Sequence, residues 1–321
     1  SEMCIRDRAY AVVAYRTAYL RCHYPVEFMA ALLTSVLGNT NKISEYSYAC
    51  KKLGIKILPP DINYGEGAFS VDHGNIRYGL TAIKSLGRPV IEAIIRERNL
   101  NGPYRDFKDL VERLSSKEIN KRTVENLIKS GALDCFHVTR KQQMIVYASV
   151  IDSIQKERKN EIAGQMSLMD LLGEEDQQSF QISYPDVGEY EKEQKLAMEK
   201  EVLGIYVSGH PLEDDIERLE RSVTAHTSDF VIDEETGKTK IHDRESCIIG
   251  GLISEMSVKL TKKNQNMAFI TLEDLRGTVE VVVFPRQYAT YQSLLREDAK
   301  VFIKGTTQIS EEESKVICNQ I

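Results

Sequence analysis

Apolar side chains recur at helical spacing in the first half of the chain and at strand spacing in its last quarter. Residues 9–37 carry the helical pattern, interrupted at Pro25, and residues 43–53 predict a further helix that ends at Gly54. Short strands and turns are expected over residues 61–78, where glycines are frequent, and helices resume through residue 154. One more helix is predicted over residues 190–203, ending at Gly204.

The last quarter of the chain predicts a small β-barrel. Runs of β-prone residues cover 248–258, 267–272, 278–284 and 300–309, and a fifth run begins near Lys315. A helical stretch, residues 287–295, lies between the third and fourth runs. Three meander strands, a helix and two strands are the chain order of an OB-fold, which binds single strands across one face and its loops. The alternative is a barrel that serves only for packing.

We therefore predict a multidomain α+β protein. Its N-terminal part is mainly α-helical, an acidic linker follows, and the chain ends in the OB-fold barrel. At 321 residues the chain can form two or three domains, and 42% of its residues are hydrophobic. No run approaches the ~20 apolar residues of a membrane span, and no leader pattern is present, so we expect a cytoplasmic protein. Six cysteines without a Cys-x-x-Cys pair argue against a zinc site or a disulfide framework.

Charge divides the chain more sharply than hydropathy does. The whole sequence has a net charge of −6, yet residues 76–141 contain 14 Lys and Arg against 8 Asp and Glu. Residues 161–245 contain 22 acidic and 8 basic residues. Like charge near a phosphate backbone opposes binding, so we expect the basic stretch to meet nucleic acid and the acidic one to space domains and contact proteins.

The basic stretch contains Ile-Lys-Ser twice, each time at a predicted helix end. In the first copy we expect two helical segments to flank a tight turn that ends in Gly87, with Pro89 in the first turn of the second helix. The start of that helix would present free amides and a positive dipole end, and Lys84 and Arg88 would add charge suited to a phosphate. This is the pattern of a helix–hairpin–helix element, which grips nucleic-acid backbone without reading bases. The alternative is an ordinary helical hairpin with solvated lysines.

Two sets of residues are candidates for binding sites, one for DNA and one for a partner protein. The predicted DNA contacts are Lys84, Ser85, Leu86, Gly87, Arg88, Lys121, Arg122, Lys129 and Gly131 in the basic stretch, and Lys259, Lys262 and Lys263 near the first barrel loop. Within the acidic linker, residues 164–172 form an apolar island that is followed by three acidic residues. Such an island can fill a preformed pocket on a partner, or it can form a short helix packed on a neighbouring domain.

The sequence contains no pattern of an active site. No Asp-x-Asp pair occurs, so the spaced carboxylates of a two-metal site are missing. A phosphate-binding loop ending at Gly237-Lys238-Thr239 would require glycine where Ile232 stands. Ser208 and His210 are neighbours in a turn without a readable acid to orient the imidazole. We therefore expect no catalytic residue, no metal site and no cofactor in this chain.

A series of short motifs in one order resembles the C-terminal half of the alpha subunit of bacterial DNA polymerase III. The resemblance runs from about Ala9 to the last residue. It is carried by residues 9–11, 24–31 (Tyr-Pro-Val-Glu-Phe-Met-Ala-Ala), 57–63 (Ile-Leu-Pro-Pro-Asp-Ile-Asn), 78–80, 82–84, 127–132 (Leu-Ile-Lys-Ser-Gly-Ala), 203–206 and 208–211 (Ser-Gly-His-Pro).

The resemblance implies an organisation of the chain. Residues 9–75 would end the fingers domain, 76–160 would be the helix–hairpin–helix DNA-binding region, and 161–188 would be a linker with the family's motif for the sliding clamp. Residues 189–245 would be an acidic helical connector, and 246–321 the OB-fold. The clamp-binding residues would be Gln165, Leu168, Met169, Leu171 and Leu172.

The resemblance also implies an activity for the parent protein. The parent would be a DNA-directed DNA polymerase that uses Mg²⁺, with primer–template duplex, single-stranded template, the sliding clamp and other holoenzyme subunits as partners. This chain lacks the family's histidinol-phosphatase-like and palm domains, so we expect it to be inactive alone. Three other departures concern Ser85, where such turns usually carry glycine, Met169, where the clamp motif usually has an aromatic residue, and residues 1–8, which look like a non-native lead.

Two other protein classes combine similar modules. A non-catalytic nucleic-acid-binding adaptor without a polymerase parent fits the same modules, and the coding sequence upstream would discriminate it. A piece of NAD-dependent DNA ligase also combines an OB-fold with helix–hairpin–helix units, but there the OB-fold comes first and a cysteine-rich zinc module intervenes. Neither feature is found in this sequence.

Overall fold

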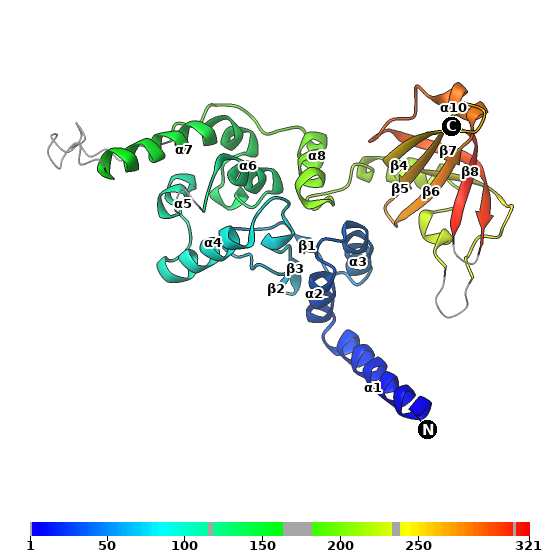
Figure 1. Ribbon diagram of the computed structural model, residues 1–321, viewed down its shortest axis with the longest axis horizontal. Coiled ribbons are helices and arrows are strands. Elements are labelled where there is room, and N and C mark those ends of the chain that lie inside the picture. Colours follow the sequence, from blue (N-terminus) through cyan, green and yellow to red (C-terminus); the bar gives the residue numbers. More distant parts are fainter. Residues whose placement is uncertain (1, 115–117, 163–181, 233–237, 311–312) are drawn as a thin grey trace. The chain divides into compact units, whose positions relative to one another are not determined.

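A computed structural model describes residues 2–114, 118–162, 182–232, 238–310 and 313–321 (Figure 1). The chain divides into two compact units, Ser1–Ser208 and Gly209–Ile321. Each unit has its own hydrophobic core.

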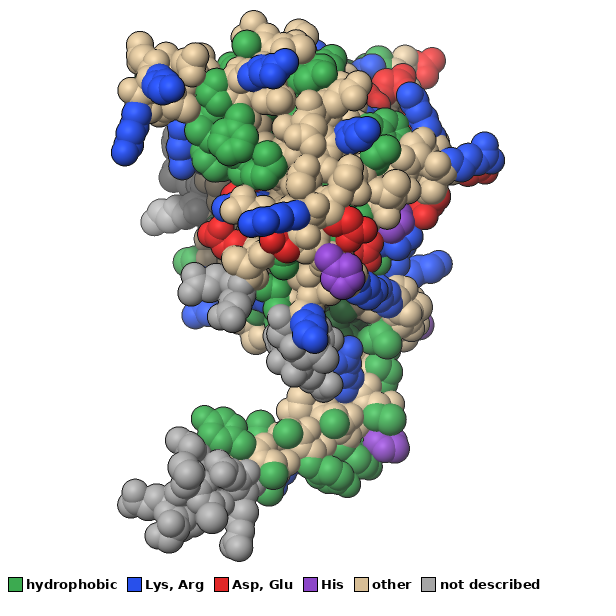
Figure 2. Space-filling model, turned by 90° about the vertical axis from the view of Figure 1, so that its right-hand side faces the viewer, with side chains coloured by type: hydrophobic (Ala, Val, Ile, Leu, Met, Phe, Trp, Pro, Cys, Tyr) green, Lys and Arg blue, Asp and Glu red, His purple; other side chains and the backbone are tan. Residues whose placement is uncertain are grey.

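The first unit begins with three helices, as the apolar spacing predicts. These are α1 (Glu2–His23), α2 (Pro25–Ser35) and α3 (Thr40–Lys52). Pro25 starts α2, because a first helical turn does not need its missing amide, and the Asn39 side chain caps α3 by accepting a hydrogen bond from Lys42 N at 3.1 Å. Hydrophobic side chains show along α1 at the bottom of Figure 2. Tyr10 and Tyr15 of this helix are exposed.

A three-stranded sheet follows, in the order β1-β3-β2. Its strands are β1 (Ile57–Leu58), β2 (Ser70–Asp72) and β3 (Asn75–Arg77), and β1 runs parallel to β3. His73 and Gly74 form the β2–β3 turn with positive φ. This agrees with the short strands and turns expected here.

The predicted helix before the first hairpin turn is wrong. Between β3 and Lys84 the chain forms one 3₁₀ turn, η1 (Leu80–Ala82), instead of an α-helix. The cause lies at Ile83 and Lys84. Ile83 is in the extended conformation (φ −73°, ψ 119°), and Lys84 N, which would donate to Leu80 O in an α-helix, donates instead to Val202 O at 2.8 Å.

The rest of the first unit is helical. It comprises α4 (Arg88–Asn101), α5 (Phe107–Arg113), α6 (Lys121–Ser130), η2 (Asp134–Phe136), α7 (Arg140–Ile162) and α8 (Lys192–Leu203). Side chains of Asp106 and Asn120 cap α5 and α6, and Gly131 and Gly204 end α6 and α8 in the left-handed conformation. α6 packs against both α7 and α8 (Figure 1).

A buried ion pair joins α7 to α8. Arg140 is 1% exposed and its Nη1 donates to Glu199 Oε1 at 3.0 Å, while Glu199 is fully buried. The other side of the guanidinium donates to Asp134, and Arg140 Nη1 also reaches Lys129 O at 3.2 Å. Glu199 Oε2 accepts from the amides of Val207 and Ser208. Both charges are therefore compensated, which a buried ion pair requires.

The second unit is the predicted barrel, preceded by η4 (Glu213–Asp215), α9 (Ile216–Ser222) and η5 (Thr227–Phe230). Its strands are β4 (Ser246–Leu260), β5 (Asn266–Glu273), β6 (Thr278–Val283), β7 (Lys300–Ile309) and β8 (Ser314–Gln320), closed in the order β4-β5-β6-β8-β7. Helix α10 (Pro285–Tyr291) follows β6. β6 and β8 pair in parallel, and β4 pairs with both β5 and β7. The OB-fold prediction is confirmed.

We expect Glu199→Gln to lower the free energy of unfolding of the first unit by about 3 kcal/mol, because the buried guanidinium of Arg140 loses the one carboxylate partner that is itself buried. The measurement is hydrogen exchange of the α6 and α7 amides, with barrel amides as the internal reference. Glu201→Gln removes the same charge from the exposed end of α8 and should cost less than about 1 kcal/mol. Equal protection of α6 and α7 in the two variants would contradict this role of Glu199.

Candidate nucleic-acid interface

An open depression of about 540 Å³ on the first unit brings several predicted DNA contacts together. Side chains from the first hairpin turn, α6 and the end of α8 line it. They are Lys84, Ser85, Lys121, Arg122, Glu125, Asn126, Lys129, Glu201 and Val202. The two Ile-Lys-Ser copies, which lie 45 positions apart in the sequence, thus contribute to one surface.

The first hairpin turn is fixed from two sides. Asn126 Nδ2 donates to Lys84 O at 2.9 Å, and Arg122 Nη2 donates to Ser85 Oγ at 3.3 Å, so α6 holds the turn through two side chains. Lys84 N donates to Val202 O at 2.8 Å, which ties the turn to the last residues of α8. Ser85 has a φ of 63°, the left-handed conformation in which glycine is usual. These hydrogen bonds explain how serine is accommodated there.

The start of α4 offers a place for an anion beside this turn. Within the described parts of the chain, no acceptor is found for the amides of Gly87 and Arg88, and Pro89 has no amide. The dipole of this 14-residue helix adds positive potential at the same point. Lys84 and Arg88 are exposed, whereas Leu86 is buried and anchors the turn from below.

The basic side chains differ in how far they are already neutralised. Among the described residues, no carboxylate lies within ion-pair distance of Lys84, Arg88 or Arg122. Lys121 pairs with Asp152 at 2.7 Å, and both side chains are exposed. Lys129 Nζ lies 2.9 Å from a carboxylate oxygen of Glu125 and 2.9 Å from one of Glu201, and it is only 15% exposed.

Gly131 has a structural role in the second hairpin, which we define as α6, the turn after the second Ile-Lys-Ser copy, and the start of α7. It is buried, its φ is 83°, and its amide donates to Ile128 O at 3.0 Å. A Cβ at this position would overlap the guanidinium of Arg140. The second turn is therefore shaped around Arg140, unlike the exposed first turn.

The three barrel lysines cluster at the β4–β5 hairpin. Lys259 Nζ lies 4.9 Å from the centre of the Phe269 ring on the neighbouring strand. Lys262 and Lys263 are exposed in the turn, which Thr261 N closes by donating to Gln265 O at 2.8 Å. Proteins that bind single-stranded nucleic acid combine cations with aromatic rings in this way.

Sequence reasoning missed four residues that line the depression, Glu125, Asn126, Glu201 and Val202. Asn126 lies four residues after Arg122, so both face the same side of α6, and this spacing was the available signal. Nothing in the sequence pairs Glu201 with Lys129, 72 positions away. The predicted clamp-binding residues Gln165, Leu168, Met169, Leu171 and Leu172 lie outside the described residues.

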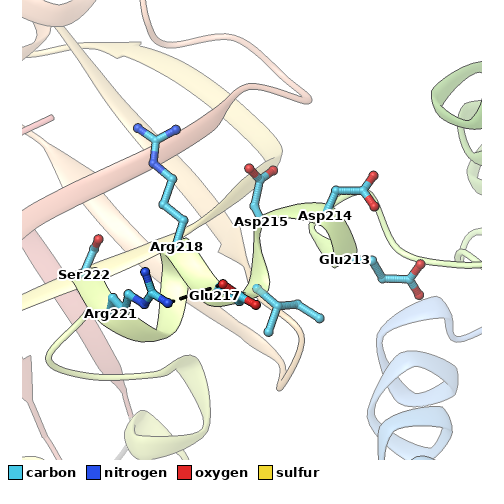
Figure 3. A pocket seen from close by; sticks show the side chains of 8 residues that line it. Glu213, Asp214, Asp215, Glu217, Arg218, Arg221 and Ser222 are labelled. Atoms are coloured by element: carbon cyan, nitrogen blue, oxygen red, sulfur yellow. Dashed lines mark hydrogen bonds and ion pairs between the residues drawn. The ribbon is translucent and has the colours of Figure 1, made fainter.

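A second depression, in the other unit, has the wrong charge for a phosphate. Figure 3 shows it, lined by residues 213–218 with Arg221 and Ser222. Its carboxylates outnumber its two arginines, and Arg221 pairs with Glu217 at 3.4 Å. Among the described residues, no group of three or more potential ligands could hold a metal ion. None of the described helices is both long enough and apolar enough to span a membrane.

Comparison with protein families places two domains on this chain. A helix-hairpin-helix motif matches residues 54–143, which include the depression-lining turn and α6. An OB-fold nucleic acid binding domain matches residues 248–321. A solved structure, the mitochondrial single-stranded DNA binding protein from S. cerevisiae, is similar at 14% identity over 25% of this chain and 92% of that one, with a TM-score of 0.21. A similarity this low carries no argument.

Curated relatives match almost the whole chain. DNA polymerase III subunit alpha from Mycobacterium tuberculosis (strain CDC 1551 / Oshkosh) is 34% identical over 97% of this chain and 26% of its own length. The subunits from Borreliella burgdorferi and Escherichia coli K12 are 35% and 37% identical over 98% and 92% of this chain. The chain spans about a quarter of the length of these relatives.

Three findings agree with one another: the helical unit with its helix-hairpin-helix domain, the OB-fold barrel, and the similarity to these alpha subunits. Over nearly its whole length the chain is a relative of the bacterial DNA polymerase III alpha subunit, whose C-terminal region it resembles.

Proposed function

We propose that this chain is the DNA-handling and clamp-tethering part of a replicative polymerase alpha subunit. The observation that carries the proposal is the first hairpin turn. Among the described residues, Lys84, Arg88 and Arg122 have no carboxylate partner there, and the amides at the start of α4 have no acceptor. Such a site recognises the shape and charge of a phosphate backbone, independent of sequence.

The parent activity is proposed from the relatives. They are alpha subunits of DNA polymerase III, so the parent of this chain would be a DNA-directed DNA polymerase that uses Mg²⁺. The present sequence has no Asp-x-Asp pair to bind two metal ions, and we propose that it does not polymerise alone. A non-catalytic adaptor would use the same DNA contacts, and the upstream coding sequence discriminates the two.

The clamp contact is proposed from the sequence. Gln165, Leu168 and Met169 belong to a mainly apolar segment within an acidic linker, and a segment of this kind can insert into a hydrophobic cleft. The barrel is proposed to meet single-stranded template through Lys259, Lys262 and Lys263.

Changing both Lys84 and Arg88 to Ala should weaken binding to every duplex sequence alike. Because two phosphate contacts are lost, the salt dependence of the binding constant should flatten by about two units. Fluorescence anisotropy of a labelled duplex over a series of salt concentrations measures both. The double variant Lys51→Ala, Lys52→Ala, exposed at the end of α3, removes the same charge away from the turn. If both double variants behaved alike, the hairpin would not be the contact.

Changing both Lys262 and Lys263 to Ala should lower affinity for a single-stranded oligonucleotide about three- to tenfold at low salt, because two exposed loop charges are removed. Duplex affinity, which we assign to the first hairpin, should stay within error. The measurement is anisotropy with the two labelled DNAs in parallel. An unchanged single-strand affinity would leave the barrel with a packing role.

Changing both Leu168 and Met169 to Ala should cost about 2–4 kcal/mol of affinity for a bacterial sliding clamp if these side chains are pocket anchors. DNA binding should not change, and this serves as the folding control. Isothermal titration of the chain with the clamp gives the affinity. If the variant bound as tightly as the parent chain, residues 164–172 would be linker only.

A further inference from the structure

The second hairpin is covered by carboxylates from the acidic segment that follows it. We call residues 189–201, which end in α8, the acidic strap. Glu189 accepts hydrogen bonds from the amides of Arg140 and Lys141, both at 3.2 Å, and from Tyr190 N at 2.8 Å. Burial raises the pKa of Glu189, but the three amides outweigh it and hold this pKa below its usual value.

The Glu189 carboxylate thus binds the free amides in the first turn of α7. In the first hairpin the equivalent place, at the start of α4, has no internal anion among the described residues. The two turns share Ile-Lys-Ser in sequence, yet one has its helix start covered and the other has it open.

The strap neutralises the basic side chains of the second hairpin as well. Glu199 is bound to the Arg140 guanidinium, and Glu201 to Lys129 Nζ at 2.9 and 3.2 Å. Lys129 is thereby held between Glu201 of the strap and Glu125 of its own helix. Three strap carboxylates, spaced along one segment, therefore contact two backbone amides and two basic side chains of one hairpin.

We propose that the acidic strap is an internal substitute for the DNA backbone on the second hairpin, and that Glu201 limits the strength of DNA binding by competing with a phosphate for Lys129. The inference rests on the proposed DNA-binding function. The first hairpin is then the site that is open to a phosphate. In the second hairpin, carboxylates of the same chain take the place of the phosphate.

The exposure of the strap residues decides which of them can be displaced. Glu199 is fully buried, so its contact is part of the core. The Glu201 side chain is 61% exposed, and an exposed ion pair contributes little to stability. Lys129, Arg122 and Lys84 line the same depression, so a phosphate bound at the first turn lies on the surface that Lys129 also reaches. Glu201 is therefore the residue where strap and DNA compete.

The test compares Glu201→Gln with Glu193→Gln in the full chain. Glu193 is exposed on the same helix and does not line the depression, so the two variants change the net charge equally. We expect Glu201→Gln to bind a labelled duplex about threefold more tightly at low salt, with a salt dependence steeper by about one unit, since one phosphate contact is gained. Glu193→Gln should show a smaller change in affinity and the same salt dependence as the parent chain.

Lys129→Gln in the Glu201→Gln background completes the test. It should abolish the gain and return the salt dependence to that of the parent chain, because the cation freed by Glu201→Gln is then removed. Equal affinities of the Glu201 and Glu193 variants, or a gain that survives Lys129→Gln, would overturn the inference while DNA binding by the first hairpin stands. A parent chain that binds no duplex at all would instead refute the proposed function.

Discussion

The first unit depends on the charge balance around Arg140. A guanidinium withdrawn from water needs carboxylates and carbonyls at every side, and this one finds them in the η2 turn, the end of α6 and the middle of α8. Since these partners lie far apart in the sequence, satisfying one buried cation fixes where α8 must lie. The position of α8 in turn supplies Val202 O to the first hairpin turn and Glu201 to Lys129.

The turn of the first hairpin is exposed, whereas the second hairpin is part of the core. The first turn keeps its charges exposed, while Asn126 bonds its backbone at Lys84 O and Arg122 bonds the Ser85 side chain, so the turn is held by α6 before any ligand arrives. A preordered site loses less conformational entropy on binding. The second turn is built around a buried ion pair and is packed beneath α8.

Local patterns were sufficient to predict the helices of the first unit and the five strands of the barrel. They failed at η1, because Lys84 N bonds to Val202 O rather than to Leu80 O, and no periodicity in the sequence indicates a bond to a residue so far away. The candidate site was predicted in part for the same reason. Lys84 and Arg88 belong to a local motif, whereas the neutralisation of Lys129 by Glu201 follows from the tertiary packing of α8.

Glycine at position 131 has a consequence for how this sequence can vary. The space that a methyl group would fill is taken by the Arg140 side chain, so every residue with a Cβ must displace a cation whose partners lie on three elements. Ser85, in the same left-handed conformation, has no such neighbour and stands at the surface. The left-handed positions of the two hairpins are Ser85, directly after Ile83-Lys84, and Gly131, one residue further along its own copy. They should therefore differ in evolutionary freedom, with the first free to drift among Gly, Asn and Ser and the second restricted to glycine.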